Sequence, residues 1–180
     1  MTRPAEPVCG IVLSGGKSSR MGADKAALEI DGRTLLDAAQ ALLAECGCDP
    51  VLVSGRPDLA NGFADSHPGG GPAHAILDAA DAMPGHCRGL LFLPVDMPAL
   101  TPADLDPLMS GDARAAHWEG FQLPLFLRAD FARPDRSETW SIRKLIGGQS
   151  ARIHAVPETQ ADRFENLNTP EAFNRFRHGR

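Results

Sequence analysis

The chain lacks the features of a membrane or nucleic-acid-binding protein. No apolar run in its 180 residues approaches the ~20 needed to cross a bilayer. The first seven residues contain no apolar core of a secretory signal. Basic residues are not in excess, because 18 Lys and Arg stand against 23 Asp and Glu, and no polybasic or acidic tail is present. We therefore expect a cytoplasmic protein that binds neither nucleic acid nor membrane.

Cysteine is scarce, and no familiar nucleophilic set is present. Cys9, Cys46, Cys48 and Cys87 do not form a disulfide framework in a chain of this length. The pair Cys46-Gly-Cys48 lacks a second Cys or His pair at the spacing that a zinc site requires. We expect four reduced thiols, and we find no convincing Ser/His/Asp or Cys/His arrangement for nucleophilic catalysis.

The first 55 residues indicate a parallel β-sheet. Val8 to Leu13 is a continuous apolar run that predicts a buried strand. Thr34, with Asp37 three residues later, predicts the start of a helix that Gly47 ends. Val51 to Val53 predicts a second buried strand, and strand–helix–strand order favours parallel pairing.

The rest of the chain continues the α/β pattern. Further strands are predicted at 89–95 and 151–156, and further helices at 72–83, 101–109, 139–146 and 169–176. The segments 113–118 and 121–127 form either a hairpin or two extended pieces, and Pro124 argues against a central strand there. We expect one domain over residues 1–180, a Rossmann-like three-layer α/β/α domain with a mostly parallel open sheet.

The stretch from Gly10 to Leu28 carries the strongest chemical signal. After the first predicted strand, Ser14-Gly15-Gly16 lets the backbone turn its N–H groups toward a ligand. Only Asp24 offsets the three cations of this stretch, which are Lys17, Arg20 and Lys25. Backbone amides and cations in this arrangement predict a cradle for a triphosphate.

The same stretch resembles a known nucleotidyltransferase loop. It lacks the dinucleotide fingerprint G-x-G-x-x-G, and the P-loop pattern fails because position 11 is Ile. It is similar to L-x-G-G-x-S-x-R-M-G-x-D-K-x-x-L, the loop of the molybdenum cofactor guanylyltransferase family, the MobA-like proteins. The matching residues are Leu13, Gly15, Gly16, Ser18, Arg20, Met21, Gly22, Asp24, Lys25 and Leu28.

Asp96 is the candidate metal ligand. It follows the predicted strand 89–95, where a carboxylate either bonds to a nearby turn or binds a cation. Its place beside a triphosphate cradle favours Mg²⁺, which takes few carboxylates plus substrate oxygens. The segment 93–100 also resembles the family motif P-x-D-M-P-x-L, whose Asp binds Mg²⁺.

The resemblance also implies nucleotide contacts outside the loop. Asp65 precedes Pro68-Gly69-Gly70-Gly71-Pro72, as a nucleotide-contacting Asp does in the family, and Ser54 stands where the family commonly has Asn. Asn168 lies in a segment similar to N-x-N-T-P-E, and it either faces the cleft or forms a turn. The implied nucleotide-binding residues are Leu13, Ser14, Gly15, Gly16, Lys25, Ser54, Asp65, Asp96 and Asn168, and the implied catalytic residues are Arg20, Lys25 and Asp96.

The resemblance implies transfer of GMP from GTP to molybdopterin, with Mg²⁺ as cofactor and pyrophosphate as product. It covers about residues 8–176, and Gln122-Leu123-Pro124-Leu125-Phe126 matches a segment that faces the acceptor in the family, with one residue inserted. We expect a monomer, with a molybdoenzyme or a cofactor-delivery protein as possible partner. The alternatives are a sister enzyme that uses CTP or another acceptor, and a non-catalytic nucleotide-binding module. The departure at Ala73-His74-Ala75, where the family continues Leu-x-Gly, motivates the second alternative.

Overall fold

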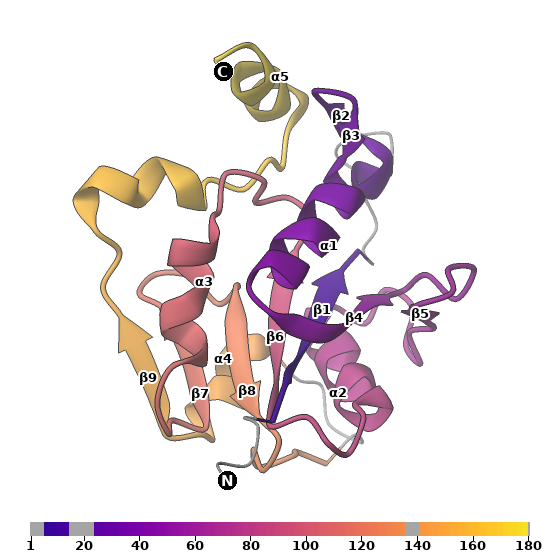
Figure 1. Cartoon of the computed structure of the whole chain (residues 1–180), viewed down its shortest axis with the longest axis vertical. Helices are drawn as coiled ribbons and strands as arrows, with labels where there is room; N and C mark the ends of the chain where they lie inside the picture. Colours follow the sequence, from indigo (N-terminus) through magenta and orange to yellow (C-terminus); the bar gives the residue numbers. More distant parts are fainter. Residues whose placement is uncertain (1–5, 15–23, 136–140, 180) are drawn as a thin grey trace, which may run out of the picture.

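The computed structural model describes residues 6–14, 24–135 and 141–179, which build a seven-stranded sheet with helices on both faces (Figure 1). The strand order is β5-β4-β1-β6-β8-β7-β9, and β2 and β3 form a separate hairpin. The strands of the main sheet are β1 Val8–Leu13, β4 Cys48–Ser54, β5 Gly62–Phe63, β6 Gly89–Pro94, β7 Ala115–Trp118, β8 Leu125–Arg128 and β9 Ala151–His154.

The strand β1 lies inside the parallel part of the sheet, as its apolar sequence predicts. All six of its residues are buried, and it pairs in parallel with β4 on one side and with β6 on the other. Its last residue, Leu13, is in register with both Ser54 of β4 and Pro94 of β6. Three strands therefore end side by side at one edge of the sheet, called here the carboxyl edge, where ligands of such sheets bind.

Of the two alternatives for 113–127 the structure shows the hairpin, but the place of the hairpin in the sheet corrects one expectation. The strand β8 pairs antiparallel with both β6 and β7, so it is a central strand. Pro124 lies immediately before β8 rather than within it, and the missing N–H of proline therefore breaks no ladder hydrogen bond. The register places Leu125 opposite Phe92, so the turn between β7 and β8 also lies at the carboxyl edge.

Helix starts follow the capping residues that the sequence predicts. The Thr34 hydroxyl accepts from the Asp37 N–H at 3.0 Å, and Gly47 follows the end of α1 with φ +77°. The fourth helix begins at Ile142 behind a Ser141 cap, later than predicted, and Thr139 lies outside the described residues. The helices are α1 Leu35–Glu45, α2 Pro72–Ala82, α3 Pro102–Met109, α4 Ile142–Gly147 and α5 Pro170–His178.

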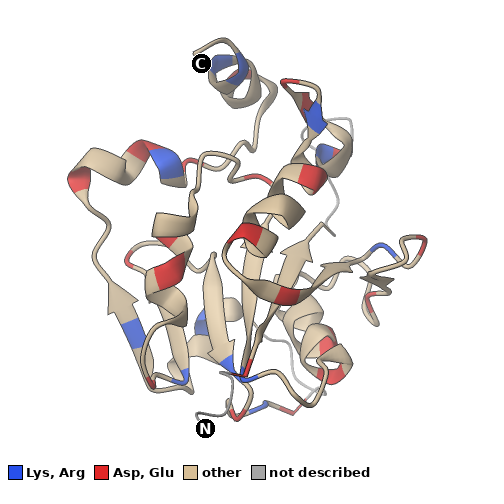
Figure 2. Ribbon diagram, in the orientation of Figure 1, with Lys and Arg blue, Asp and Glu red and all other residues tan. Residues whose placement is uncertain are grey.

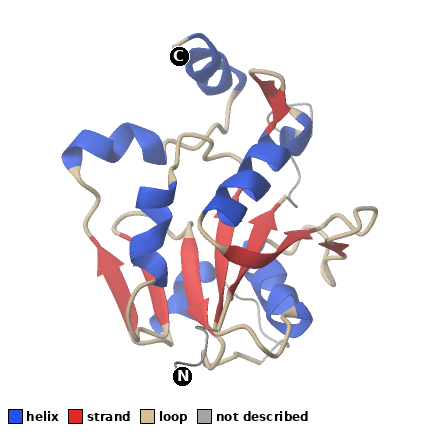
Figure 3. Cartoon of the chain, viewed as in Figure 1, coloured by secondary structure: helices blue, strands red, loops and turns tan. Residues whose placement is uncertain are grey.

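The two faces of the sheet bury two separate hydrophobic cores. Along β1, Val8 and Val12 pack with the core that contains Leu35 and Leu43 of α1, together with apolar residues of α3 and α5. Cys9, Ile11 and Leu13 of the same strand pack with the core that contains residues of α2 and α4. This alternation confirms the three-layer α/β/α architecture (Figure 3), because successive side chains of a strand point to opposite faces.

Further short elements lie outside the main sheet and the five α-helices. They are the 3₁₀-helix η1 Lys25–Ala27, the hairpin strands β2 Glu29–Ile30 and β3 Arg33–Thr34, and the 3₁₀-helix η2 Glu158–Phe164. Acidic and basic positions are interspersed over the elements (Figure 2). Among the described residues, none of the helices combines the length and the apolar character that a bilayer span needs.

Candidate nucleotide-transfer site

Three side chains from distant parts of the chain meet at the carboxyl edge. The Lys25 ammonium donates to Asp96 Oδ2 at 3.0 Å and to Asn168 Oδ1 at 2.6 Å. Lys25 is on η1, Asp96 follows β6, and Asn168 precedes α5. The Lys25 and Asp96 side chains are 16% and 18% exposed, so the ion pair is largely buried but keeps some accessible surface. We call Lys25, Asp96 and Asn168 the Lys25 cluster.

Backbone contacts hold the Lys25 cluster together. The Leu167 N–H donates to the Asp96 carbonyl at 2.8 Å, which fixes Asn168 beside the end of β6. Asp24 caps η1, because its Oδ1 accepts from the Ala26 N–H at 3.1 Å. Backbone hydrogen bonds therefore hold the segments that carry Asp96 and Asn168 together, and the cap of η1 holds the segment that carries Lys25.

A second group of predicted residues meets at the end of β4. The Ser14 hydroxyl donates to the Ser54 carbonyl at 2.7 Å, and the Ser54 hydroxyl donates to Asp65 Oδ1 at 2.7 Å. Ser54 is completely buried, whereas Asp65 is partly exposed. The structure thus places Asp65 at the accessible end of this group. It does not expose Ser54, whose hydroxyl is hydrogen-bonded to Asp65 inside the protein.

Leu13 lies between the two groups. It is the last residue of β1 and is buried, so only its backbone is close to the edge. The predicted residues Gly15, Gly16 and Arg20 lie outside the described residues, as do Lys17 and Ser18 of the same loop. Their predicted roles in phosphate binding stay predictions.

The sequence reasoning missed Arg56. Its guanidinium forms an ion pair with Asp24, and it stands two residues after Ser54. The signal that could have found it is a basic residue just beyond a predicted strand that ends at the ligand edge. Asp24, the carboxylate of the cation-rich loop, is therefore neutralised by a residue outside that loop.

His74 is a buried histidine in the first turn of α2. Its ring stacks on His67 with 4.7 Å between centroids, and its Nδ1 has no hydrogen-bond partner among the described residues. Its neighbours Ala73 and Ala75 are buried as well. The segment in which the sequence departs from Leu-x-Gly is therefore packed inside the protein.

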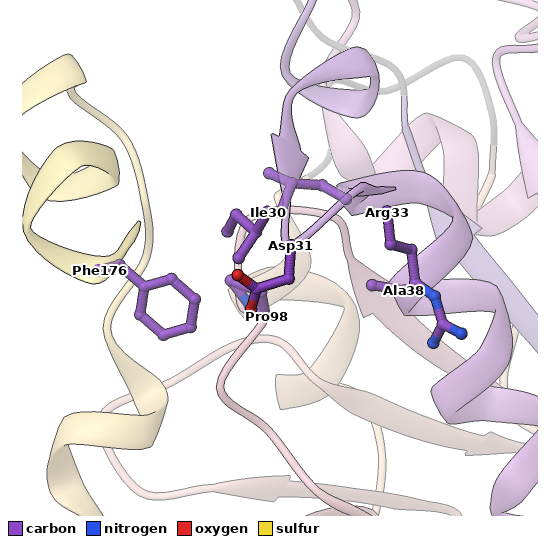
Figure 4. Close-up of a pocket in the computed structure, with 7 residues that line it drawn as sticks. Ile30, Asp31, Arg33, Ala38, Pro98 and Phe176 are labelled. Carbon is purple, nitrogen blue, oxygen red and sulfur yellow. The ribbon is translucent and has the colours of Figure 1, made fainter. Parts of the chain in front are cut away.

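Two cavities have linings that do not include the Lys25 cluster. One of about 370 Å³ lies between the β2–β3 hairpin, α1 and α5; Figure 4 shows Phe176 reaching from α5 toward Ile30, Asp31 and Pro98. None of the predicted site residues lines it. Another of about 320 Å³ lies beside the β7–β8 turn and α4, and it includes Gln122 and Arg143.

The four cysteines are buried or partly buried. All four cysteines are free, as expected. Burial is the main cause that raises the pKa of Cys9, Cys46 and Cys48 to about 12 each, and it also raises the pKa of Cys87. These thiols remain protonated at neutral pH, which fits structural cysteines rather than nucleophiles.

The fold and the charged carboxyl edge define an α/β nucleotidyltransferase. Residues 10–154 match the family model described as the MobA-like NTP transferase domain. A molybdenum cofactor guanylyltransferase of Xanthomonas euvesicatoria pv. vesicatoria is 41% identical over 188 residues, covering 96% of this chain and 95% of the relative. The chain belongs to the MobA-like NTP transferase family, as the resemblance of its motifs predicts.

Solved structures agree on the fold. The molybdopterin-guanine dinucleotide biosynthesis protein A of Archaeoglobus fulgidus superposes with a TM-score of 0.74 at 18% identity, covering 94% of this chain and 97% of that one. A Mycobacterium tuberculosis protein solved as a complex with manganese superposes with a TM-score of 0.63 at 17% identity, covering 95% and 98%. At these identities the likeness concerns the fold alone.

Proposed function

We propose that this chain is a molybdenum cofactor guanylyltransferase that transfers GMP from GTP to Mo-molybdopterin. The products are molybdopterin guanine dinucleotide and pyrophosphate. The observation that carries the proposal is the Lys25 cluster, in which an ammonium group is held between Asp96 and Asn168 at the carboxyl edge. The 41% identical relative supports the choice of substrates.

The proposed reaction requires no general base from the protein. A terminal phosphate oxygen of molybdopterin attacks the α-phosphorus of GTP, and the bond to the bridging oxygen breaks, so that pyrophosphate leaves with the electron pair. A phosphate monoester has a second pKa of about 6, so it is largely ionised at neutral pH. The difficulty is to bring anions together, and the Lys25 ammonium offsets negative charge at that point.

The oxygen donors of the Lys25 cluster fit a divalent cation. Asp96 Oδ2 and Asn168 Oδ1 are brought together by one ammonium, and a carboxylate with an amide oxygen suits Mg²⁺. Within the described ranges, no three His, Cys, Asp or Glu side chains form a complete metal site, so the remaining ligands would be substrate oxygens and water. Bound Mg²⁺ would neutralise phosphate oxygens, and we propose Asp96 as its protein carboxylate.

The two substrates are proposed to lie on opposite sides of the Lys25 cluster. The nucleotide takes the β4–β5 side, where Asp65 is accessible and Ser14 marks the start of the cation-rich loop. The acceptor takes the β7–β8 side, where the cavity of about 320 Å³ offers an amide from Gln122 and a cation from Arg143. The phosphates then meet in the middle, beside Lys25 and Asp96.

The proposal extends to the oligomeric state, the location and the partners of the protein. We infer a single nucleotidyltransferase domain that works as a monomer in the cytoplasm, with Mo-molybdopterin received from, or its product passed to, a protein partner. The net charge of −5 supports small-molecule substrates over nucleic acid.

Product analysis tests the proposal directly. Purified protein is incubated with Mo-molybdopterin, Mg²⁺ and one of GTP, CTP or ATP, and the pterin product and pyrophosphate are measured. A guanine dinucleotide from GTP alone supports the proposal. A cytosine dinucleotide would assign the chain to the CTP-dependent alternative, and GTP binding without any product would favour a non-catalytic module.

A further inference from the structure

The segment Ser54–Arg56 at the end of β4 contacts both halves of the candidate site. Its first residue bonds to Ser14 and Asp65, and its last residue bonds to Asp24. Ser14 and Asp24 are the described residues on either side of the loop stretch 15–23. One three-residue segment therefore holds both flanks of the predicted phosphate loop as well as the predicted nucleotide carboxylate.

The Ser54 side chain contacts Asp65 and not the solvent. Its side chain has no exposed surface, and its hydroxyl donates to Asp65 Oδ1 at 2.7 Å. A hydrogen bond from a buried donor fixes the rotamer of an otherwise accessible carboxylate. The Ser54 carbonyl accepts from the Ser14 hydroxyl at 2.7 Å, so the same residue also fixes the start of the loop.

Arg56 is linked to Lys25 through Asp24. Its guanidinium binds Asp24 Oδ2, while Asp24 Oδ1 caps η1 at the Ala26 N–H. Lys25 is the first residue of η1, so the direction of its side chain depends on this cap. The Arg56 side chain is 25% exposed, so its ion pair with Asp24 is partly shielded from solvent.

The backbone of the segment is itself held firmly. The Gly55 N–H donates to the Phe63 carbonyl at 2.9 Å, and the Leu59 N–H donates to the Arg56 carbonyl at 3.1 Å. A Cβ at Gly62 would lie 1.6 Å from the Arg56 carbonyl oxygen, so only glycine permits this approach. A firmly held segment can transmit position to the groups that it contacts.

We propose that Ser54 and Arg56 are positioning residues of the transfer site: Ser54 orients Asp65 toward the nucleotide, and Arg56 orients Lys25 through Asp24. Nucleotide recognition at the end of β4 then belongs to the Asp65 carboxylate and not to the strand residue itself. This inference rests on the proposed function, since it assigns roles within the same nucleotide site.

The Arg56 role is tested by separating kcat from KM. Arg56→Gln should lower kcat by about tenfold with a smaller change in the KM for GTP, because a misplaced catalytic group costs rate and leaves the nucleotide pocket in place. Arg56→Lys keeps the charge and should retain most of the activity. Arg133→Gln is the control, because it removes another Arg–Asp ion pair, the one with Asp81 on α2.

The Ser54 role is tested by a double-mutant cycle on nucleotide affinity. Ser54→Ala should raise the Kd for GTP by about three- to tenfold, since it removes one hydrogen bond to a charged group. The same change made in an Asp65→Ala background should have no further effect, because the residue that Ser54 positions is gone. Ser54→Thr keeps the hydroxyl and should bind GTP as the wild type does.

The outcomes separate this inference from the proposed function. Wild-type protein that binds no nucleotide overturns the proposed function itself. Wild-type protein that binds and transfers GMP, with Arg56→Gln indistinguishable from Arg133→Gln and with additive effects at Ser54 and Asp65, overturns only the positioning roles. Melting temperatures are recorded for every variant, and the series at the partly exposed Arg56 provides the test even where a change at buried Ser54 lowers stability.

Discussion

Lys25 and Asp96 are 71 positions apart in the sequence, yet the Lys25 ammonium lies 3.0 Å from the Asp96 carboxylate at the carboxyl edge of the sheet. The ammonium also donates to Asn168, so one cation holds two oxygen donors in place. An arrangement that gathers charge without offering a nucleophile suits the transfer of a nucleotidyl group between phosphates.

Replacing Lys25 with alanine should weaken both binding and transfer. Loss of one charge that stabilises the transition state costs about 2.7–4 kcal/mol, or roughly 10²- to 10³-fold in rate. Steady-state kinetics and the Kd for GTP provide the measurement, with Lys144→Ala as a control on an exposed helix position. An unchanged Kd together with an unchanged rate would remove Lys25 from the site.

Replacing Asp96 with asparagine should abolish the response to Mg²⁺ while leaving the fold intact. The amide keeps the shape of the side chain but loses the charge that a divalent cation needs. Product formation is measured across a Mg²⁺ titration, with Asp81→Asn as the control because Asp81 is an exposed acid on α2. Full activity with an unchanged Mg²⁺ dependence in Asp96→Asn would contradict the metal assignment.

Arg143→Gln should raise the KM for Mo-molybdopterin and leave the Kd for GTP unchanged. Arg143 lines the cavity beside the β7–β8 turn, on the side of the Lys25 cluster away from Asp65. We expect an increase of about 10- to 150-fold, since a hydrogen bond to a charged group is worth about 1.5–3 kcal/mol. Arg133→Gln again serves as the control, and a selective effect on GTP binding would place the acceptor elsewhere.

Trp118→Phe should lower the free energy of unfolding by about 1–3 kcal/mol. The indole N–H donates to the Asp104 carbonyl at 2.9 Å, and the ring packs edge-on against Phe164. Phenylalanine removes this buried hydrogen bond and leaves a gap beside the carbonyl. Urea unfolding gives the measurement, and Ile153→Ala, at a 60% exposed position, should change stability little.

Stability should fall as the pH rises from about 9 toward 12. The folded protein raises the pKa of Cys9, Cys46 and Cys48 from 9.0 to about 12, so it holds these protons more tightly than the unfolded chain does. This contribution is complete below pH 9 and is lost as the pH rises through the folded pKa. Urea titrations at several pH values measure the slope, and Cys48→Ala should make it shallower. A slope that Cys48→Ala leaves unchanged would show that other groups cause it.

The Lys25 cluster shows how far local sequence reasoning reaches. Asp96 could be placed at a strand end because 89–94 is an apolar run, and Lys25 could be placed in a cation-rich loop because of its neighbours. Their contact could not be predicted from periodicity, since it depends on where η1 and the segment before α5 come to lie. The ion pair of Arg56 with Asp24 could not be predicted for the same reason, because the two residues lie 32 positions apart in the sequence.

Ser54 and Pro124 show what one-dimensional patterns leave out. The sequence places the Ser54 hydroxyl at a strand end, and only the assembled sheet shows that Ser54 is completely buried while Asp65 is partly exposed. A proline argues against a central strand, but β8 begins one residue later and occupies the centre of the antiparallel part. In both cases burial and strand order are properties of the assembled sheet.

The sequence by itself indicated the alternation of strands and helices along the chain, the family and the candidate residues of the site. Hydrophobic periodicity, helix caps and the glycine-rich loop depend on residues close together in the sequence, so they can be recognised in short segments of it. The tertiary structure decided which side chains meet, which are buried and which carbonyls and carboxylates they bind. Long-range contacts depend on how the elements pack, and packing brings Lys25, Asp96 and Asn168 to one point at the edge of the sheet.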